Sequence, residues 1–329
     1  MENKNWIEVA RELKREKGIS WTKLPGELYK ETGLRVEAHR IRDAVRSYEA
    51  SNGLAQSSKP EMSVVANLSD VHIGKKTCST DYEKLCERIY YFFDEVTEKI
   101  KVLKKTNIIN TVHINFIGDI IDNDMLYPSQ PYHVDKGNAG HATQQIKAAT
   151  LLFSEAINKF QKTNKIKVII NAVKGNHGRI SKFTDESNNF DIMFYDSLEL
   201  ALDRNSNIEF NISTDFYNLF YVENHGFLLN HGNGVRMYQN IPWYGLVQRC
   251  MRWAGSLPNH FEYMIVGHFH TSGEQEWNDK TIYMNGTAVT DDNFAVEMLG
   301  LSASNKMWVF GVTKDNGIEQ RFKIDLNNV

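Results

Sequence analysis

Cysteine is scarce in this chain of 329 residues, which contains only Cys78, Cys86 and Cys250. No two of them form a Cys-x-x-Cys pair, so neither a disulfide framework nor a thiolate zinc site is expected. Long apolar runs are also missing, since none approaches the roughly 18–20 residues of a membrane span. The N-terminal residues lack the apolar core of a secretory signal. These absences favour a soluble protein of the reducing cytoplasm that has no membrane partner.

The composition is otherwise that of an ordinary globular protein, with 41% apolar and 24% charged residues. A disordered or collagen-like chain is therefore excluded. The net charge of −3 predicts no overall attraction to nucleic acid. However, residues 1–60 hold twelve basic and nine acidic side chains. We expect a polyanion to meet this N-terminal segment first.

The first fifty residues predict three short helices. In the first helix, apolar residues recur at helical spacing at Trp6, Val9, Ala10 and Leu13. Gly18 is expected to end that helix, Ser20 to cap the start of the second helix, and Gly33 to close it. The third helix has its apolar side at Val36, Ile41, Ala44, Val45 and Tyr48.

Basic side chains gather on the third predicted helix and just before it, at Arg35, His39, Arg40, Arg42 and Arg46. This segment resembles the recognition helix of a helix-turn-helix domain, which implies contacts with DNA. Acidic residues are interleaved with the basic ones, so a helical bundle with solvated charges is the alternative. Residues 51–61 have the small, polar composition of a linker. We expect a helix-turn-helix-like domain over 1–50 and a second domain over 62–329.

Beyond the linker, short β-rich runs alternate with helical patterns, which predicts a βαβαβ order and an α/β sheet. The two helices are expected near residues 85–103 and 143–160. From about residue 208 strands dominate, apart from one helical insert near residues 243–254. These later strands are expected at 216–222, 226–232, 263–268, 281–286 and 306–313. We interpret them as a second sheet packed on the first.

Five of the apolar runs end in Asp, Asn or His. The residues at these ends are Asp70 and His72, Asp119, Asn176 and His177, His231, and His268 and His270. Ligands of open α/β sheets bind beyond the carboxyl ends of the strands, so these side chains are expected to converge. Oxygen and imidazole donors without thiolate suit Mn²⁺, Fe²⁺ or Zn²⁺. So many donors exceed the needs of one ion, and we expect a carboxylate that bridges two.

The blocks D-x-H, G-D, G-N-H, H-G and G-H-x-H, in this order, resemble the calcineurin-like metallophosphoesterase superfamily over roughly residues 63–290. The resemblance implies an α/β fold of two stacked mixed β-sheets flanked by helices, and two divalent metal ions, Mn²⁺ being the first choice. It also implies roles for the strand-end residues. Asp70, His72 and His270 would hold the first metal, Asp119 would bridge, and Asn176, His231 and His268 would hold the second. His177 would contact the phosphate and serve as general acid for the leaving oxygen.

The chemistry of such a centre suits phosphodiester hydrolysis. Two cations neutralise the phosphoryl oxygens and lower the pKa of a bridging water, so that hydroxide attacks in line. Two positions depart from the family pattern. Gly178 stands where an acidic residue usually follows the G-N-H block, and the histidine that DNA-repair members of the SbcD type often place after G-D is absent. Asp122 either orients a metal-bound water or caps a turn, of which we favour the second.

Two inserts and several isolated histidines remain. The polar insert over 127–141 contains His133 and His141, which are candidates for substrate contact. The insert after His231 mixes arginine with aromatic residues. These either stack bases or, as their helical spacing favours, pack into the core or form a dimer face. The histidines without a partnered motif are interpreted as core or surface residues, namely His39, His113, His225 and His260.

The joining of a helix-turn-helix-like segment to this core favours a metal-dependent phosphodiesterase acting on nucleic acid, and within that class a DNA exonuclease or endonuclease. A phosphatase or phosphodiesterase of nucleotides, other small phosphoesters or phosphoproteins is the first alternative. A non-catalytic DNA-binding or adaptor protein is the second. For a repair-type nuclease, the resemblance also implies a homodimer and an ATPase partner.

Overall fold

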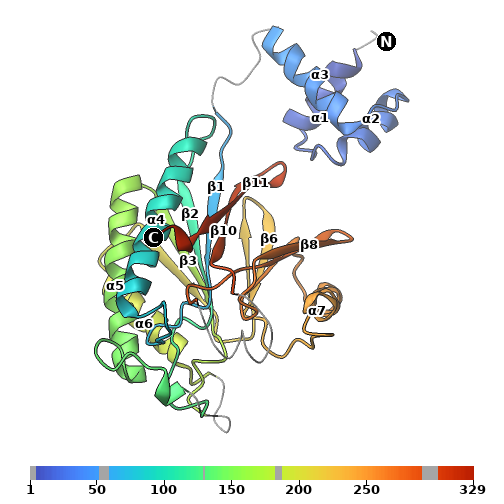
Figure 1. Ribbon diagram of the computed structural model, residues 1–329. Helices are drawn as coiled ribbons and strands as arrows, with labels where there is room; N and C mark the ends of the chain where they lie inside the picture. The colour runs from blue at the N-terminus through green and yellow to red at the C-terminus, as the bar shows by residue number, and fades with distance from the viewer. Residues whose placement is uncertain (1–4, 52–58, 129, 182–186, 291–302) are drawn as a thin grey trace. The chain divides into compact units, whose positions relative to one another are not determined.

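The computed structural model describes residues 5–51, 59–128, 130–181, 187–290 and 303–329 (Figure 1). The chain divides into two compact units. The first comprises Met1–Pro60 with Asp315–Gly317, and the second Glu61–Lys314 with Ile318–Val329. Within the described ranges, no helix is both long enough and apolar enough to cross a membrane.

The three predicted helices of the first unit are confirmed as α1 (Trp6–Arg15), α2 (Leu24–Thr32) and α3 (Ala38–Ser51). They enclose a small apolar core of Ala10, Leu13, Trp21, Leu24, Leu28, Ile41 and Val45. The buried carboxylate of Glu49 accepts two hydrogen bonds from the Arg15 guanidinium, each 3.0 Å long. This ion pair joins α3 to α1.

Of the two limits predicted for α2, the C-terminal one is confirmed and the N-terminal one is wrong. Gly33 closes the helix in the left-handed conformation, with φ 73°, as predicted. The predicted N-cap at Ser20 is wrong, because Lys23 occupies the cap position and Pro25 stands in the first turn. Proline has no backbone N–H and its fixed φ suits the first turn of a helix, which explains the later start. The Ser20 hydroxyl instead lies 3.0 Å from the hydroxyl of Thr22.

The second unit contains two mixed β-sheets. The first sheet has the strand order β11 (Gly317–Asp325), β10 (Lys306–Thr313), β1 (Ser63–Leu68), β2 (Thr111–Ile117), β3 (Lys167–Val173) and β4 (Ile208–Ile212). Strands β1 to β4 run parallel. The second sheet has the order β5 (Asn218–Val222), β6 (His225–Asn230), β7 (Tyr263–Val266), β9 (Lys280–Met284) and β8 (Gly273–Trp277). Here β6, β7 and β9 run parallel.

Helices cover the outer faces of both sheets (Figure 1). The helices α4 (Tyr82–Leu103), α5 (Ala142–Asn164) and α6 (Phe190–Leu202) pack on the first sheet. The helix α7 (Trp243–Ser256) packs on the second sheet. Between the two sheets lies a separate apolar cluster, formed by residues of both. Two single 3₁₀ turns, Gln130–Tyr132 and Leu326–Asn328, complete the described elements. The predicted α/β fold of two stacked mixed sheets flanked by helices is confirmed.

One strand belongs to a different sheet from the one we predicted. The sequence pattern places the run over 306–313 in the second sheet, but this run forms β10, which pairs antiparallel with β1 in the first. For example, Val65 lies opposite Phe310. Because β10 is covered on both faces, almost all of its residues are apolar. A run of this kind does not indicate with which neighbouring strand it will pair.

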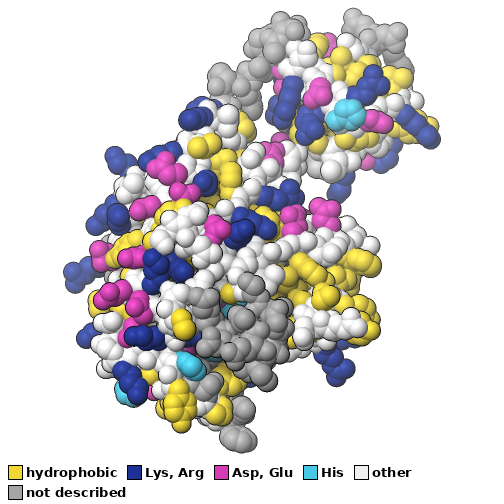
Figure 2. All heavy atoms as spheres, in the orientation of Figure 1, with side chains coloured by type: hydrophobic (Ala, Val, Ile, Leu, Met, Phe, Trp, Pro, Cys, Tyr) yellow, Lys and Arg dark blue, Asp and Glu magenta, His cyan; other side chains and the backbone are white. Residues whose placement is uncertain are grey.

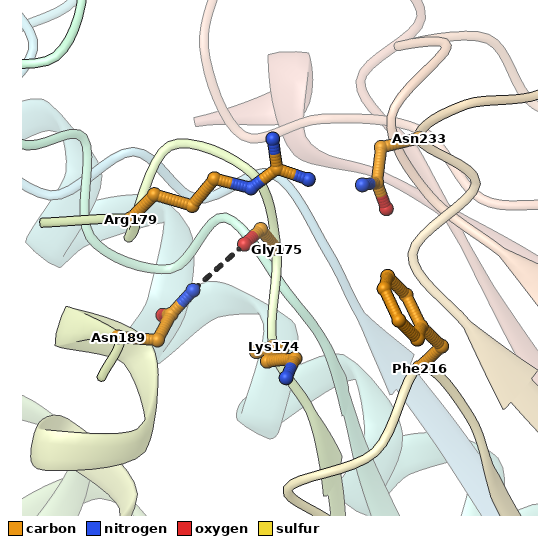
Figure 3. Close-up of a pocket in the computed structure, with 6 residues that line it drawn as sticks. All are labelled: Lys174, Gly175, Arg179, Asn189, Phe216 and Asn233. Atoms are coloured by element: carbon orange, nitrogen blue, oxygen red, sulfur yellow. Dashed lines mark hydrogen bonds between the residues drawn. The ribbon is translucent and has the colours of Figure 1, made fainter. Parts of the chain in front are cut away.

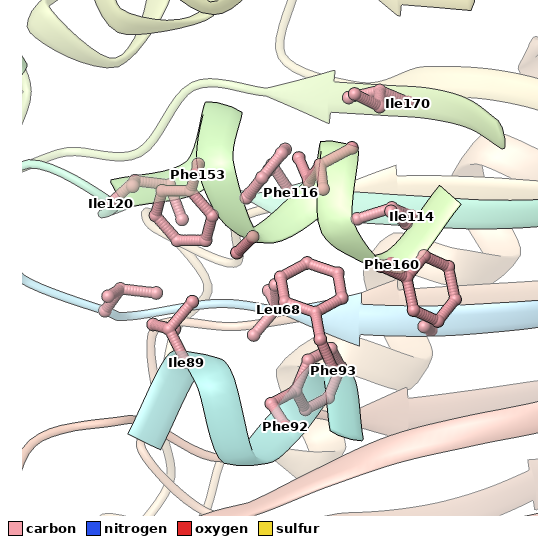
Figure 4. Packing of buried hydrophobic residues seen from close by; sticks show 14 of the residues in the cluster. Leu68, Ile89, Phe92, Phe93, Ile114, Phe116, Ile120, Phe153, Phe160 and Ile170 are labelled. Atoms are coloured by element: carbon pink, nitrogen blue, oxygen red, sulfur yellow. The ribbon is translucent and has the colours of Figure 1, made fainter. Parts of the chain in front are cut away.

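The helix-facing side of the first sheet forms the main core. Alternate residues of the strands, such as Ile114 and Phe116 of β2, point to the helices. Figure 4 shows Phe116 beside Phe153 of α5, with ring centroids 5.1 Å apart in an edge-to-face arrangement. On the same side, Phe92 and Phe93 extend from α4. This core holds the parallel strands in place from one side.

The opposite face of the first sheet carries a row of asparagines, one on each of four adjacent strands. The amide of Asn115 donates to Oδ1 of Asn67 at 2.8 Å. The amide of Asn171 donates to Asn115, and that of Asn211 to Asn171, both at 3.0 Å. A slip of one residue would turn these amides to the other face and leave buried polar groups unpaired, which is costly. This row of four asparagines, the asparagine ladder, thus fixes the register of the four strands. The register in turn brings the carboxyl ends of the strands to the same edge of the sheet.

Candidate metal centre

Polar side chains follow five parallel strands where the strands leave the two sheets at a common edge. The first sheet supplies Asp70 and His72 after β1, Asp119 after β2, and Asn176 and His177 after β3. The second sheet supplies His231 after β6, and His268 and His270 after β7. Side-chain contacts link all eight predicted residues into one cluster.

The backbone at this edge turns sharply to aim the side chains. Five of the eight residues have a left-handed backbone with φ between 50° and 70°, namely Asp70, His72, Asp119, His268 and His270. Residues with a Cβ rarely adopt this conformation, and each instance costs of order 1 kcal/mol. So many strained residues at one place are typical of a functional site rather than of a structural turn.

The first group of donor atoms comes from Asp70, His72 and His270. The Nε2 atoms of His72 and His270 lie 3.1 Å apart, and Oδ1 of Asp70 is 3.3 Å from Nε2 of His270. Burial lowers the pKa of His72, which favours the neutral imidazole that a metal needs. Both oxygens of Asp70 also accept the backbone N–H of His268, at 3.0 Å each. Three donor atoms are therefore directed at one small volume.

The second group comes from Asp119, His231 and His268, with Asn176 beside it. Nε2 of His231 lies 3.0 Å from Oδ2 of Asp119 and 3.1 Å from Oδ1 of Asn176. Nδ1 of His231 donates to the carbonyl of Ile117 at 2.7 Å, which turns Nε2 toward the other donors. Burial opposes the charged form of His231, but the Asp119 carboxylate raises the pKa to about 9. A proton on His231 therefore competes with a cation for this position.

Asp119 lies between the two groups. One of its oxygens belongs to the group of His231 and His268, and a carboxylate oxygen also lies within 4.8 Å of donor atoms of His72 and His177. Its Oδ1 accepts the backbone N–H of His177 at 2.7 Å. This is the place that a carboxylate bridging two ions would occupy.

The donor set fits divalent cations. Asp70 and Asp119 are completely or almost completely buried, and in the described part of the chain the ion pairs of both are with histidine rather than with lysine or arginine. Buried carboxylates are unfavourable unless they are paired or bind a metal. Imidazole and oxygen donors without thiolate suit Mn²⁺, Fe²⁺ or Zn²⁺. Two such cations would more than neutralise these two carboxylates and would leave positive charge for a phosphate.

Asp191, in the first turn of α6, is an important residue that the sequence reasoning missed. Its buried carboxylate accepts the backbone N–H of Asp119 at 2.9 Å, that of Gly175 at 2.8 Å, and those of Ile120 and Ile121 at 3.0 Å each. It thus fixes the loop after β2 to the loop after β3. Burial and the nearby Asp119 charge raise its pKa to about 6. The sequence offers one signal for it: Asn189 is a typical N-cap residue and indicates that a helix starts there, with Asp191 in its first turn.

The favoured interpretation of Asp122 as a turn cap is wrong. Its buried Oδ1 lies 3.0 Å from Nδ1 of His72 and 3.1 Å from Nδ1 of His177. Burial would raise the pKa of Asp122, but the bonds to the two imidazoles lower it below the usual value. The loop can turn Asp122 inward because Asp191 holds the preceding amides. Asp122 therefore orients His177, although Gly178 stands where the superfamily that the sequence resembles usually has an acidic residue.

The polar insert reaches the site through Tyr127 and Gln130. The Tyr127 hydroxyl accepts a hydrogen bond from Nδ2 of Asn176 at 3.1 Å, which leaves Oδ1 of Asn176 facing His231. The buried Gln130 amide donates to the carbonyl of Asp122 at 2.6 Å. The two histidines singled out in this insert, His133 and His141, are exposed, and Nδ1 of His141 pairs with Asp124 at 2.7 Å.

The favoured interpretation of the second insert, core packing, is confirmed for α7. Leu246 and Cys250 are buried against the second sheet, and the aromatic residues Trp243 and Trp253 pack beside them. Of the isolated histidines, His113 is a buried core residue, stacked on Phe220 with a centroid distance of 5.7 Å. His39 and His260 lie at the surface.

The basic residues named for DNA contact lie at the surface of the first unit. Arg35 lies over the ring of Tyr29, 5.2 Å from its centre, and His39 is 3.4 Å from Glu37. In the residues that the structure describes, no acidic group forms an ion pair with Arg40, Arg42 or Arg46. Figure 2 shows basic side chains on this unit with acidic ones among them. Contact with DNA stays a prediction.

Comparison with known proteins adds only a general likeness of fold. No family model matches the sequence, and no curated protein matches it. An archaeal phosphodiesterase is similar over 80% of this chain and 99% of its own, with 11% identity and a TM-score of 0.37. Vps29 from Cryptosporidium parvum is similar over 80% and 96%, with 15% identity and a TM-score of 0.37. A predicted phosphoesterase from Streptococcus pneumoniae is similar over 80% and 98%, with 11% identity and a TM-score of 0.31.

Proposed function

We propose that this protein is a metal-dependent phosphoesterase that hydrolyses phosphodiester bonds of nucleic acid, with DNA as the first candidate. The main support is the pair of donor groups, Asp70 with His72 and His270, and Asp119 with His231 and His268, next to a partly exposed His177. Divalent cations held there, Mn²⁺ first among them, would supply charge that neutralises a phosphate and activates water. The side chains themselves would supply the proton for the leaving group and orient the reacting groups.

His177 is placed to act as the general acid. Its Nδ1 bonds to Asp122, so Nε2 is the nitrogen available to a leaving oxygen. Burial opposes the charged form of His177, whereas Asp119 and Asp122 raise its pKa to about 9 in the metal-free site. The bond to Asp122 supports the imidazolium also when cations neutralise Asp119. An imidazolium can protonate an alkoxide that would otherwise leave poorly.

The neighbouring residues orient this machinery. Asp122 holds both His72 and His177, and Asp191 holds the backbone of the two loops that carry Asp119 and Asn176. Oriented donors that need no rearrangement during the reaction are the common means by which such sites lower a barrier.

The basic side chains of α3 support nucleic acid as the substrate. No acidic group of the described ranges pairs with Arg40, Arg42 or Arg46, and arginines in this state attract phosphates. The test replaces Arg40, Arg42 and Arg46 by glutamine in the full chain. DNA affinity should fall, and the slope of log affinity against log salt should flatten by about 0.9 for each phosphate of duplex DNA that the variant no longer neutralises. The matched control replaces three exposed lysines of the second unit, Lys105, Lys147 and Lys162. Equal slopes in both triple variants would contradict DNA binding by α3.

The decisive experiment on activity supplies Mn²⁺ and compares single-stranded DNA, duplex DNA, RNA, bis(p-nitrophenyl) phosphate and p-nitrophenyl phosphate. We expect DNA cleavage that disappears in Asp119→Ala and persists in Asp196→Ala, an exposed acid of α6. Hydrolysis of the small esters alone would favour a hydrolase of nucleotides or phosphoproteins. A protein that binds DNA and hydrolyses none of the esters would instead be an adaptor.

A further inference from the structure

Arg249 of α7 lies against the loop that carries the predicted metal ligand His231. One nitrogen of its guanidinium, Nη1, donates to the carbonyl of Asn233 at 3.0 Å and to Oδ1 of Asn230 at 3.3 Å. The same oxygen of Asn230 accepts the backbone N–H of Gly232 at 3.0 Å. Arg249 therefore contacts this loop on both sides of His231.

The loop that Arg249 holds borders the metal centre. Figure 3 shows Asn233 and Gly175 on two sides of one small hollow, and Gly175 directly precedes the predicted ligand Asn176. Asn233 also follows His231 by two residues, a step that spans at most about 7 Å. The Arg249 guanidinium thus stands beside the cluster of donor atoms.

One edge of this guanidinium is available to a ligand. Arginine has five N–H donors, and the two on Nη1 are used by the loop. Within the described residues, Nε and Nη2 have no hydrogen-bond partner, and neither is among the buried polar atoms that lack one, so both reach solvent. These two nitrogens form a fork that fits two oxygens of one phosphate. The guanidinium lies over the ring of Trp253, 5.5 Å from its centre, which restricts its movement.

The charge of Arg249 has no counter-ion in the described part of the chain. The side chain is half-buried, and burial lowers its pKa, whereas no carboxylate raises it. Taking a cation partly out of water costs free energy unless an anion pairs with it. A neutral amide side chain could donate to the same loop acceptors without that cost. The positive charge at this place therefore indicates that an anion binds there.

The segment around Arg249 is free of acidic residues. Residues 224–261, which include the loop and all of α7, contain neither Asp nor Glu. The chain has 41 acidic residues among 329, so about five would be expected in a stretch of this length. In the turn before β9, which contacts α7 at Met251, Asp279 is paired with Lys280. No acidic side chain of the segment itself therefore opposes the binding of a phosphate.

We propose that Arg249 binds the phosphate next to the scissile phosphodiester of nucleic acid, a role that rests on the proposed function. The metal centre takes the scissile phosphate, and the Nε–Nη2 edge of Arg249 binds two oxygens of the neighbouring one. A nucleic-acid strand offers such a second phosphate, whereas a p-nitrophenyl ester or a singly phosphorylated peptide does not. Arg249 therefore distinguishes a nucleic acid from these smaller substrates.

The first test compares thymidine dinucleotides, with Mn²⁺ and the full chain. TpT contains only the phosphodiester, while pTpT and TpTp carry one further phosphate on the 5′ or the 3′ side. The wild-type protein should prefer one of the phosphorylated forms in kcat/KM by about tenfold or more, as expected for hydrogen bonds between charged groups. Arg249→Gln should lose this preference, and Arg249→Lys should keep part of it. Arg252→Gln removes an exposed arginine of the same helix and should retain it in full.

The second test measures binding of a fluorescent oligothymidylate by anisotropy in EDTA over a salt series, so that it does not depend on turnover. Arg249→Gln should flatten the slope of log affinity against log salt by about 0.7, the value for one phosphate contact on a single strand. Arg252→Gln should leave the slope unchanged. Thermal unfolding of each variant verifies that it is folded.

A residue that only braces the loop would give a different result. In that case Arg249→Gln lowers kcat/KM by the same factor on TpT and on the phosphorylated dinucleotides, together with the affinity for Mn²⁺, and the proposal is overturned. Equal salt slopes for the wild-type protein and Arg249→Gln would also overturn it. So would an equal change in Arg249→Gln and Arg252→Gln, which would indicate a general effect of charge.

The outcomes separate this proposal from the proposed function. If the wild-type protein hydrolyses none of the dinucleotides, the proposed function fails, and the salt series still decides whether Arg249 binds a phosphate of the strand. Hydrolysis of a phosphoserine peptide, without binding of the oligothymidylate, would overturn both the role of Arg249 and the choice of nucleic acid.

Discussion

The carboxylate of Asp122 is buried and lies 3.1 Å from Nδ1 of His177. The same oxygen lies 3.0 Å from Nδ1 of His72, so one carboxylate sets the orientation of both imidazoles. Asp122 therefore acts through its neighbours and is a positioning residue. This relationship yields the first prediction.

Asp122→Asn should lower kcat about 10- to 100-fold, the usual effect of removing a residue that orients a ligand or catalytic group. KM should change little, because Asp122 is buried and bonds to the two imidazoles rather than to solvent. The measurements are kcat and KM on bis(p-nitrophenyl) phosphate together with the Mn²⁺ content. Asp124→Asn changes a neighbouring acid that pairs with His141 at 2.7 Å, and it serves as the control. Equal kcat values for the two variants would contradict the role of Asp122.

His177→Ala should retain metal and lose turnover, in contrast to Asp119→Ala, which should lose both. General acid catalysis is worth about 10²- to 10⁴-fold, and it matters most when the leaving group is a poor one. The loss should therefore be large for a DNA phosphodiester and small for a p-nitrophenyl ester, whose leaving group needs no proton. The check is the ratio of the two losses in single-turnover reactions. The same loss for both substrates would exclude His177 as the general acid.

Asn115→Ala tests the asparagine ladder between the sheets. The substitution leaves Oδ1 of Asn67 and one N–H of Asn171 without their partners in a buried layer. Each unsatisfied buried group costs about 1–3 kcal/mol, so the free energy of unfolding should fall by roughly 2–5 kcal/mol. Urea denaturation measures this difference. Asn110→Ala, an exposed residue just before β2, should change the free energy by less than about 0.5 kcal/mol.

His113 should make folding stability depend on pH. Burial lowers its pKa from 6.5 to about 4, and the amide of Asn171 donates to its Nδ1 at 3.2 Å, a bond that requires the neutral ring. Between these two values the unfolded chain binds a proton that the folded chain does not. The contribution of His113 is therefore complete above about pH 6.5 and is lost as the pH falls toward 4, by roughly 3 kcal/mol.

The measurement is the free energy of unfolding by urea at several pH values. His113→Gln should remove this part of the pH dependence, whereas His133→Gln, at an exposed histidine, should leave it intact. An unchanged pH profile in His113→Gln would show that other buried groups account for it.

The strand-end residues could be predicted because their sequence context is local. A buried parallel strand is mostly apolar, and the acidic, amide or imidazole residue in the loop after it, as at Asp119 after β2, marks the carboxyl end of the strand. All five strand ends that we predicted are present in the structure. The helical face of α7 was equally readable, because its buried Leu246 and Cys250 are spaced by one turn.

The supporting residues could not be predicted in the same way. Asp191 reaches backbone amides 72 residues earlier in the chain, and Asp122 reaches an imidazole 50 residues earlier. Tyr127 acts on Asn176 from a loop that has no regular pattern. A carboxylate or a phenol has the same local sequence signal whether it caps a turn or holds a distant group, so only the folded chain distinguishes the two cases.

The sequence by itself determined most of the elements and the chemistry of the donor atoms, because periodicity and residue type are properties of the local chain. It did not indicate α6, β4, β8 or β11. It also determined that the donors would meet, since parallel strands carry their carboxyl ends to one edge. The tertiary structure alone decided the sheet to which β10 belongs, the register that the asparagine ladder fixes, and the pairing of Asp122 with His177. These depend on which distant surfaces bury one another, and that is decided by packing over the whole chain.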